Sequence, residues 1–186
     1  MKEVDLYDFD KTLFPFDSGS KFALFCVLHY PWCAVFIPLT AGGAILALAH
    51  VISWSAFKKI CFSFMALIPR DKAIKSFWDR YESRVFPWVK DRTRESVIIS
   101  ASPDFLLEDI QKRLGFEGLI CTRHNKKTGA IIGKNCRAEE KVRRFKEEYG
   151  DTKVCDVYSD SVKHDAPMCF KESDLIIECM NTIDFK

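Results

Sequence analysis

Short apolar runs alternate with helix-like segments along most of this chain, and the alternation restricts its fold more than any other feature. The runs are rich in β-branched residues and are expected to form strands at 4–8, 96–100, 119–123, 154–158 and 175–179. The helical patterns fall at about 104–114, 139–149 and 165–170. Strands that alternate with helices are typical of a doubly wound parallel sheet. The sequence therefore predicts an α/β fold.

A second pairing is expected beside this sheet. Residues 119–123 and 130–132 flank a Lys-Lys-Thr-Gly turn. Two apolar runs separated by a short turn that contains glycine are typical of a hairpin. We therefore expect a strand pair at this place, in addition to the parallel strands.

A hydrophobic segment separates the first expected strand from the second. From 22 to 57 the chain contains no Asp, Glu, Lys or Arg, and Pro31, Pro38 and the pair Gly42-Gly43 interrupt what would otherwise be helix. Amphipathic helical spacing returns from 58 to 94. This pattern indicates an all-helical insert with an unusually apolar first half.

The length of 186 residues suits one α/β domain with a small accessory element. We expect residues 1–18 and 92–186 to form a catalytic core, and residues 19–91 to form the helical insert that contains the uncharged stretch 22–57. Two full domains are not expected.

Two carboxylates follow the first expected strand, in the string Asp8-Phe9-Asp10-Lys11-Thr12. In an extended chain Asp8 and Asp10 point to the same side, where their charges repel each other. A bound divalent cation relieves that repulsion, so that one carboxylate can act as a nucleophile and the other can exchange a proton with the leaving group. An acidic turn that caps a helix has the same composition, so this string alone leaves both interpretations open.

Three more polar groups occur where later apolar runs end or a helix begins. Ser100 follows a β-branched run, Lys141 lies near the start of a helix, and Asp160 follows the run at 154–158. In a parallel sheet such positions gather at the carboxyl ends of the strands, where ligands bind. A hydroxyl and a cation suit a phosphoryl group, and carboxylates suit Mg²⁺. Each group taken alone also fits a cap, a turn or a solvated surface residue.

Taken in order, the four groups resemble the motifs of the haloacid dehalogenase superfamily, and in particular the branch that includes phosphoserine phosphatase. The resemblance covers Val4 to about Ile177, and the helical insert matches the cap that this branch places between its first and second motifs. It implies a Rossmann-like core and a phosphatase that uses Mg²⁺ as cofactor.

The resemblance also implies roles for the matching residues. Asp8 would attack phosphorus to give an aspartyl-phosphate, and Asp10 would protonate the leaving alcohol and then activate water. Ser100 and Lys141 would bind the phosphoryl group. Asp8, the backbone carbonyl of Asp10, and Asp160 would hold Mg²⁺.

The last two motifs depart from the family pattern. Thr12 would brace the acidic turn and Asp165 would support the metal ligands, but Asp165 lies one step later than the commonest spacing, and Ser159 stands where many relatives have glycine. Either Arg137 or Lys141 can align as the phosphate-binding cation. We prefer Lys141 because the family uses an ammonium group.

The net charge bears on the partners of the protein. A net charge of +2 gives no reason to expect nucleic acid.

The cysteines and the N-terminus bear on the compartment. The eight cysteines form no CxxC pair, and Asp5, Asp8 and Asp10 break any signal core at the N-terminus. We therefore expect reduced cysteines, no cleavable leader and a cytoplasmic protein.

The uncharged stretch 22–57 leaves two arrangements open. Expected catalytic groups occur on both sides of it, which excludes a single membrane span. Two spans would have roughly 16 residues each, or about 24 Å of helix, against a hydrocarbon core of about 30 Å. The stretch is therefore either a packed apolar insert or a shallow hairpin in one leaflet at the cytoplasmic face of a membrane. Lys21, Lys58 and Lys59 at its ends suit anionic lipid.

The substrate follows from the same alternatives. We expect a phosphate monoester, either of a small metabolite or of a lipid such as phosphatidylglycerophosphate, on which some members of the resembled family act. The competing hypothesis is a non-catalytic module that uses the fold to bind a membrane or a partner protein. A binding module has no need for an acid beside a nucleophile, which speaks against that hypothesis.

Overall fold

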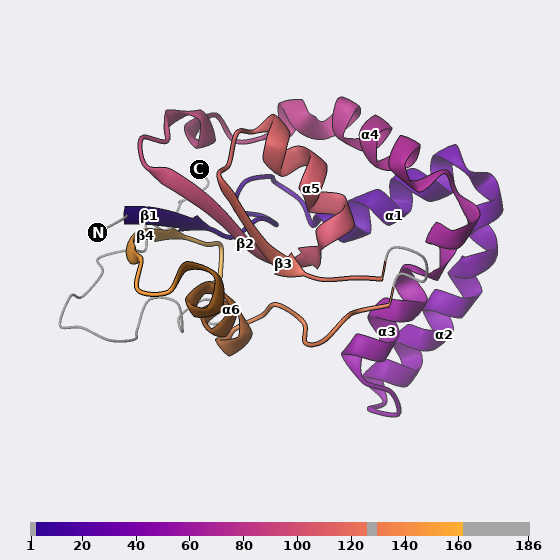
Figure 1. Cartoon of the computed structure of the whole chain (residues 1–186). Helices are drawn as coiled ribbons and strands as arrows, with labels where there is room; N and C mark the ends of the chain where they lie inside the picture. The colour runs from indigo at the N-terminus through magenta and orange to yellow at the C-terminus, as the bar shows by residue number, and fades with distance from the viewer. Residues whose placement is uncertain (1–2, 126–129, 162–186) are drawn as a thin grey trace.

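A parallel sheet, to which the described residues contribute four strands, forms the centre of the molecule (Figure 1). The computed structural model describes residues 3–125 and 130–161. The strands lie in the order β3-β2-β1-β4 and each neighbouring pair is parallel. Their bounds are Glu3–Tyr7 for β1, Glu95–Pro103 for β2, Gly118–Thr122 for β3 and Lys153–Tyr158 for β4. The predicted α/β fold with a parallel sheet is confirmed.

Both faces of the sheet are covered, as a doubly wound fold requires. Helix α5 (Asp104–Arg113) packs on one face, where its apolar residues share a core with Tyr7 of β1. On the other face Phe145 of α6 (Glu139–Tyr149) packs against Val4 and Leu6. Successive residues of β1 point to opposite faces, which explains why Leu6 and Tyr7 belong to different cores.

A long helical insert lies between β1 and β2, at one side of the sheet in Figure 1. It consists of α-helices and short 3₁₀ helices: α1 (Ser18–His29), η1 (Pro31–Val35), α2 (Phe36–Leu48), α3 (Trp54–Cys61), η2 (Ser63–Leu67), α4 (Arg70–Tyr81), η3 (Glu82–Arg84) and η4 (Pro87–Asp91). The insert packs on the core through Trp78, which is fully buried and whose indole N–H donates to the Leu106 carbonyl at 2.7 Å.

The expected break at Gly42-Gly43 is wrong. Helix α2 runs through both glycines, and Pro38 lies in its first turn, where a missing N–H costs nothing. The helix passes close to α3 at Gly43, where a Cβ would come within 3.0 Å of Ile60 and 3.3 Å of Phe57. Gly43 therefore permits close packing of two helices, and the glycine pair does not end α2.

The expected strand pair at 119–123 and 130–132 is present in a shorter form. Strand β3 pairs in parallel with β2, and the antiparallel pairing begins only after it, with a bridge between His124 and Ile131. Two backbone hydrogen bonds flank this bridge, from Asn125 N–H to the Ala130 carbonyl at 2.7 Å and from Ile132 N–H to the Arg123 carbonyl at 2.8 Å. The turn between them lies outside the described residues, as do the predicted helix at 165–170 and the predicted strand at 175–179.

Candidate active site

Asp8 lies immediately beyond the carboxyl end of β1. Its backbone N–H donates to the Tyr158 carbonyl at 2.8 Å, which continues the pairing of β1 with β4 by one residue. The side chain is 15% exposed. Asp8 is therefore held by the sheet and keeps a carboxylate within reach of a ligand.

Lys141 approaches the Asp8 carboxylate from α6, which covers the face of the sheet opposite to α5. Its ammonium Nζ lies 2.8 Å from Asp8 Oδ1, and its side chain is 4% exposed. Lys141 belongs to the first turn of α6, which follows Ala138 in the unusual conformation of φ 50°. Arg137, the other cation considered, is exposed. The structure thus brings Lys141 to Asp8 and leaves Arg137 on the surface.

Asp10 is held by the start of the insert and by β2. Its Oδ1 accepts the backbone N–H of Ser18 at 2.7 Å, and its Oδ2 accepts the hydroxyl of Ser102. Ser18 and Ser102 are buried, and their hydroxyls lie 3.3 Å apart. Because both oxygens of Asp10 accept hydrogen bonds, the orientation of this carboxyl group is fixed.

The surroundings of Asp10 favour its protonated form. Burial raises the pKa of the Asp10 carboxyl above its ordinary value, and the hydrogen bonds from Ser102 and Ser18 offset part of that effect. A carboxyl group with a raised pKa is better suited than an ordinary one to give a proton to a leaving group. The two carboxylates of the acidic turn therefore have different environments and suit different tasks.

Ser102 is the site residue that sequence reasoning missed. The predicted phosphate-binding residue, Ser100, is buried in β2, where its hydroxyl accepts the backbone N–H of Ser102 at 3.1 Å. The strand does not end at Ser100 but continues to Pro103. Residues two apart in a strand share a face, and this spacing is the signal that would have placed Ser102 beside Ser100.

Thr12 joins the acidic turn to the loop after β4. Its hydroxyl oxygen accepts the backbone N–H of Asp160 at 3.0 Å, and Thr12 is buried. This contact fits the bracing part expected of Thr12. Asp160 itself is exposed at the carboxyl end of β4, next to the end of β1. Asp165 lies outside the described residues.

The oxygen atoms at these two strand ends suit a hard cation. Within the part of the chain that the structure describes, no group of three or more His, Cys, Asp or Glu side chains is arranged to hold a metal ion. The expected ligand set needs only two such side chains, those of Asp8 and Asp160, together with the backbone carbonyl of Asp10. Carboxylate and carbonyl oxygens with several waters are the ligands that Mg²⁺ prefers.

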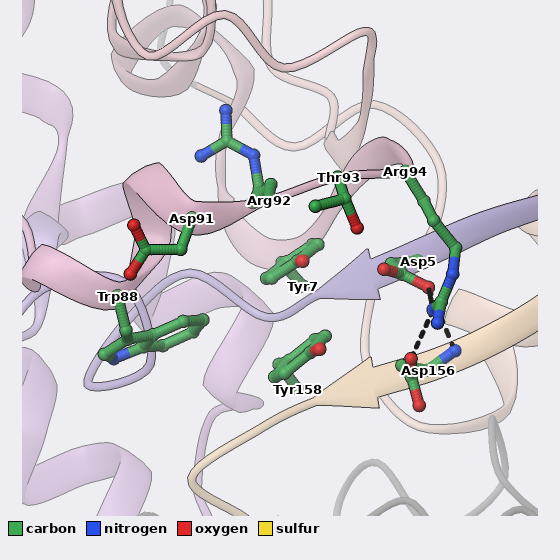
Figure 2. Close-up of a pocket in the computed structure, with 9 residues that line it drawn as sticks. All are labelled: Asp5, Tyr7, Trp88, Asp91, Arg92, Thr93, Arg94, Asp156 and Tyr158. Carbon is green, nitrogen blue, oxygen red and sulfur yellow. Dashed lines mark hydrogen bonds and ion pairs between the residues drawn. The ribbon is translucent and has the colours of Figure 1, made fainter.

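A pocket lies on the face of the sheet that carries Tyr7, between β1, β4 and the segment that leads into β2 (Figure 2). The rings of Tyr7 and Tyr158 stack with centroids 4.5 Å apart, and Arg94 pairs with Asp5 at 2.7 Å and with Asp156. None of the predicted site residues that the structure describes lines it. The stacked rings instead tie together the ends of the strands that lead to Asp8 and Asp160.

Comparisons with known proteins give the family of this chain. A family model described as haloacid dehalogenase-like hydrolase matches residues 6–169. Protein CicA of Caulobacter vibrioides is 37% identical over 71 residues, which cover 35% of this chain and 32% of CicA. This chain therefore spans about a third of the length of that relative.

Two solved structures share the fold over most of both chains. A protein with unknown function from Bordetella pertussis Tohama I has a TM-score of 0.75 at 20% identity, with 91% of this chain and 86% of that chain covered. A phospho-aspartyl intermediate analogue of phosphoserine phosphatase has a TM-score of 0.50 at 19% identity, with 90% and 81% covered. The predicted family and fold are thus confirmed: the chain belongs to the haloacid dehalogenase-like hydrolase family.

Proposed function

We propose that the chain is a Mg²⁺-dependent phosphatase that hydrolyses a phosphate monoester through an aspartyl-phosphate on Asp8. The observation that carries this proposal is the contact of 2.8 Å between Lys141 Nζ and Asp8 Oδ1. Two residues after Asp8 lies the carboxyl group of Asp10, whose pKa burial raises. Family membership and the fold shared with phosphoserine phosphatase support a phosphoric monoester hydrolase.

The proposed reaction has two steps. A carboxylate oxygen of Asp8 attacks phosphorus, the bond from phosphorus to the ester oxygen breaks, and Asp10 gives its proton to the departing alkoxide. Asp10 then takes a proton from water, and the hydroxide attacks phosphorus to release phosphate and restore Asp8. Lys141 stabilises the charge on the phosphoryl oxygens, and Ser100 would bind one of them.

The metal would be held by Asp8, the backbone carbonyl of Asp10, and Asp160. When bound, Mg²⁺ neutralises negative charge on the carboxylates and on the phosphoryl group. The chain itself contributes the placement of these ligands. The Thr12 hydroxyl holds the backbone of Asp160, and pairing with β4 holds the backbone of Asp8.

The substrate is either a small phosphorylated metabolite or a lipid phosphate such as phosphatidylglycerophosphate. One fold neighbour is a phosphoserine phosphatase, and phosphoserine is a substrate of the first kind. The apolar insert favours the second kind. For either substrate we propose a cytoplasmic protein, which for a lipid would work at the cytoplasmic face of the membrane.

A non-catalytic binding module on the same fold is the second candidate. The arrangement around Asp10 argues against it, because burying a carboxyl group costs stability and a module without chemistry gains nothing from it. This chain keeps such a carboxyl group at Asp10 and fixes its orientation, because Ser18 and Ser102 donate hydrogen bonds to its two oxygens.

A hydrolysis screen tests the proposal. Phosphorylated metabolites and lipids are incubated with the protein and Mg²⁺, and released phosphate is measured beside Asp8→Asn and beside a sample treated with chelator. We expect the wild type to release phosphate, chelation to abolish this activity and added Mg²⁺ to restore it. The Asp8→Asn variant should release no phosphate, although its circular dichroism spectrum should match that of the wild type. Full activity of Asp8→Asn would show that another residue is the nucleophile.

A further inference from the structure

The outer side of the insert carries most of the large apolar side chains that the described residues expose. Two lie elsewhere, at Leu67 and Ile132. The others form what we call the apolar face: Leu24, Leu28, Trp32, Val35, Ile37, Leu39, Ile45, Leu46, Leu48 and Val51. So many exposed apolar side chains within one short stretch of the chain indicate a site of interaction with a protein or a membrane.

The inner side of α2 is already occupied, which limits what the apolar face can do. Gly43 and Ala47 are buried one helical turn apart, and a Cβ at Gly43 would meet Ile60 and Phe57 of α3. In Figure 1, α2 and α3 lie side by side at the edge of the molecule farthest from β4. The two helices therefore form a hairpin whose remaining surface faces outward.

The sequence around this face contains no negative charge. From Ser18 to Arg70 there is no Asp or Glu, whereas Lys21, Lys58, Lys59 and Arg70 are basic. The acidic residues resume at once on either side, at Asp17 and Asp71. A second copy of the chain would bring a surface of the same sign against this one, whereas an anionic lipid surface has the complementary sign.

The geometry fits a position within one leaflet. The segment Pro31–Leu48 is long and apolar enough to cross a membrane, and 17% of it is buried inside the molecule. Helix α2 alone is about 20 Å long, against a hydrocarbon core of about 30 Å. Both α1 and α3 lead back to the same core, so the chain must return to the side from which it came. An apolar helical hairpin that enters one leaflet without crossing the bilayer agrees with the length of α2 and with the return of the chain to the same side.

We propose that the apolar face seats the protein on an anionic bilayer, with α2 inserted in one leaflet. This inference concerns the partner of the insert and does not depend on whether Asp8 is the nucleophile. It selects the shallow hairpin from the two arrangements of 22–57 that the sequence leaves open.

Vesicle flotation tests the proposal with the full chain. The protein is mixed with vesicles of phosphatidylcholine alone or of phosphatidylcholine with phosphatidylglycerol, and the bound fraction is measured after centrifugation. The variant Ile45→Glu/Leu48→Glu changes two residues that are 66% and 67% exposed. The matched control is Ile132→Glu, a residue that is 53% exposed outside the face. Thermal unfolding checks that each variant folds.

We expect the wild type and Ile132→Glu to float with the phosphatidylglycerol vesicles, and the double variant to bind about tenfold more weakly. Wild-type protein that stays unbound, or a double variant that binds like the wild type, would overturn the proposal. Equal binding to vesicles with and without phosphatidylglycerol would overturn the claim that the face prefers anionic lipid. Wild-type protein could instead fail to bind vesicles and form a dimer in light scattering, while the double variant is a monomer. That result would assign the face to a second copy of the chain.

The same flotation with Asp8→Asn separates this proposal from the proposed function. We expect Asp8→Asn to bind vesicles like the wild type even though it lacks turnover. Activity without vesicle binding refutes the membrane surface alone, and vesicle binding without activity refutes the proposed chemistry alone.

Discussion

The ammonium group of Lys141 lies 2.8 Å from a carboxylate oxygen of Asp8, although the two residues are 133 positions apart in the chain. The contact connects the carboxyl end of β1 with the first turn of α6, which covers the opposite face of the sheet from α5. Since both side chains are largely buried, each stabilises the charge of the other. The pair is therefore both a structural tie and the centre of the proposed chemistry.

Replacement of Lys141 by Met is expected to damage both stability and turnover. Loss of the ammonium group beside the largely buried Asp8 carboxylate should lower the free energy of unfolding by about 3 kcal/mol. Loss of the cation that faces the phosphoryl charge should lower kcat by about 10²–10³-fold. Urea denaturation and steady-state kinetics with the substrate from the screen measure the two effects.

Two further variants make that prediction specific. Adding Asp8→Asn to Lys141→Met should restore part of the lost stability, because the negative charge that Lys141 balanced disappears. Arg137→Met should keep a rate near that of the wild type, since Arg137 is exposed and Lys141 is the cation at Asp8. A large loss of rate in Arg137→Met with little in Lys141→Met would reverse the assignment.

The contact between Thr12 and Asp160 predicts an effect on metal affinity. Thr12→Val keeps the size of the side chain but removes the oxygen that accepts the Asp160 N–H. With that loop less well held, the Mg²⁺ concentration that gives half of maximal rate should rise about tenfold. Thr12→Ser retains the hydroxyl and should restore the affinity. If Val and Ser variants need the same Mg²⁺ concentration, Thr12 serves stability alone.

The hydrogen bond from Ser102 predicts a shift in pH dependence. This bond lowers the pKa of Asp10 against the larger raising effect of burial, so Ser102→Ala should raise that pKa further. A proposed general acid works only while it is protonated. The alkaline limb of kcat/KM should therefore move to higher pH in Ser102→Ala and stay in place in Ser102→Thr. An unchanged limb in the Ala variant would show that Asp10 is not the group that titrates there.

The sequence was sufficient to predict the sheet and the family, because both follow from short-range patterns. Each predicted strand of the parallel sheet that falls within the described residues is present, since β-branched runs between turns have few other stable arrangements. The order of the motifs then predicted that Asp8 and Lys141 would approach each other. Such a prediction uses topology alone, since parallel strands end at one edge of the sheet.

Contacts that depend on local exceptions were not predictable. Strand β2 continues past Ser100 with a shift of register before Pro103, and only this extension brings Ser102 to Asp10. The glycine pair in α2 has the composition of a helix break, but packing against α3 outweighs that local preference. In both cases a partner far away in the sequence decides the outcome.

The two glycines of α2 give a final test, because they differ in their surroundings alone. A Cβ at Gly42 would meet nothing within 4 Å, whereas one at Gly43 would press on Ile60 and Phe57 at 3.0 and 3.3 Å. Alanine favours a helix over glycine by about 1 kcal/mol. Gly42→Ala should therefore stabilise the protein by about that amount in urea denaturation, while Gly43→Ala should gain less because α3 must move. Equal gains in both variants would mean that α2 and α3 do not pack closely in solution, and the outward surface of the hairpin would then have to be defined anew.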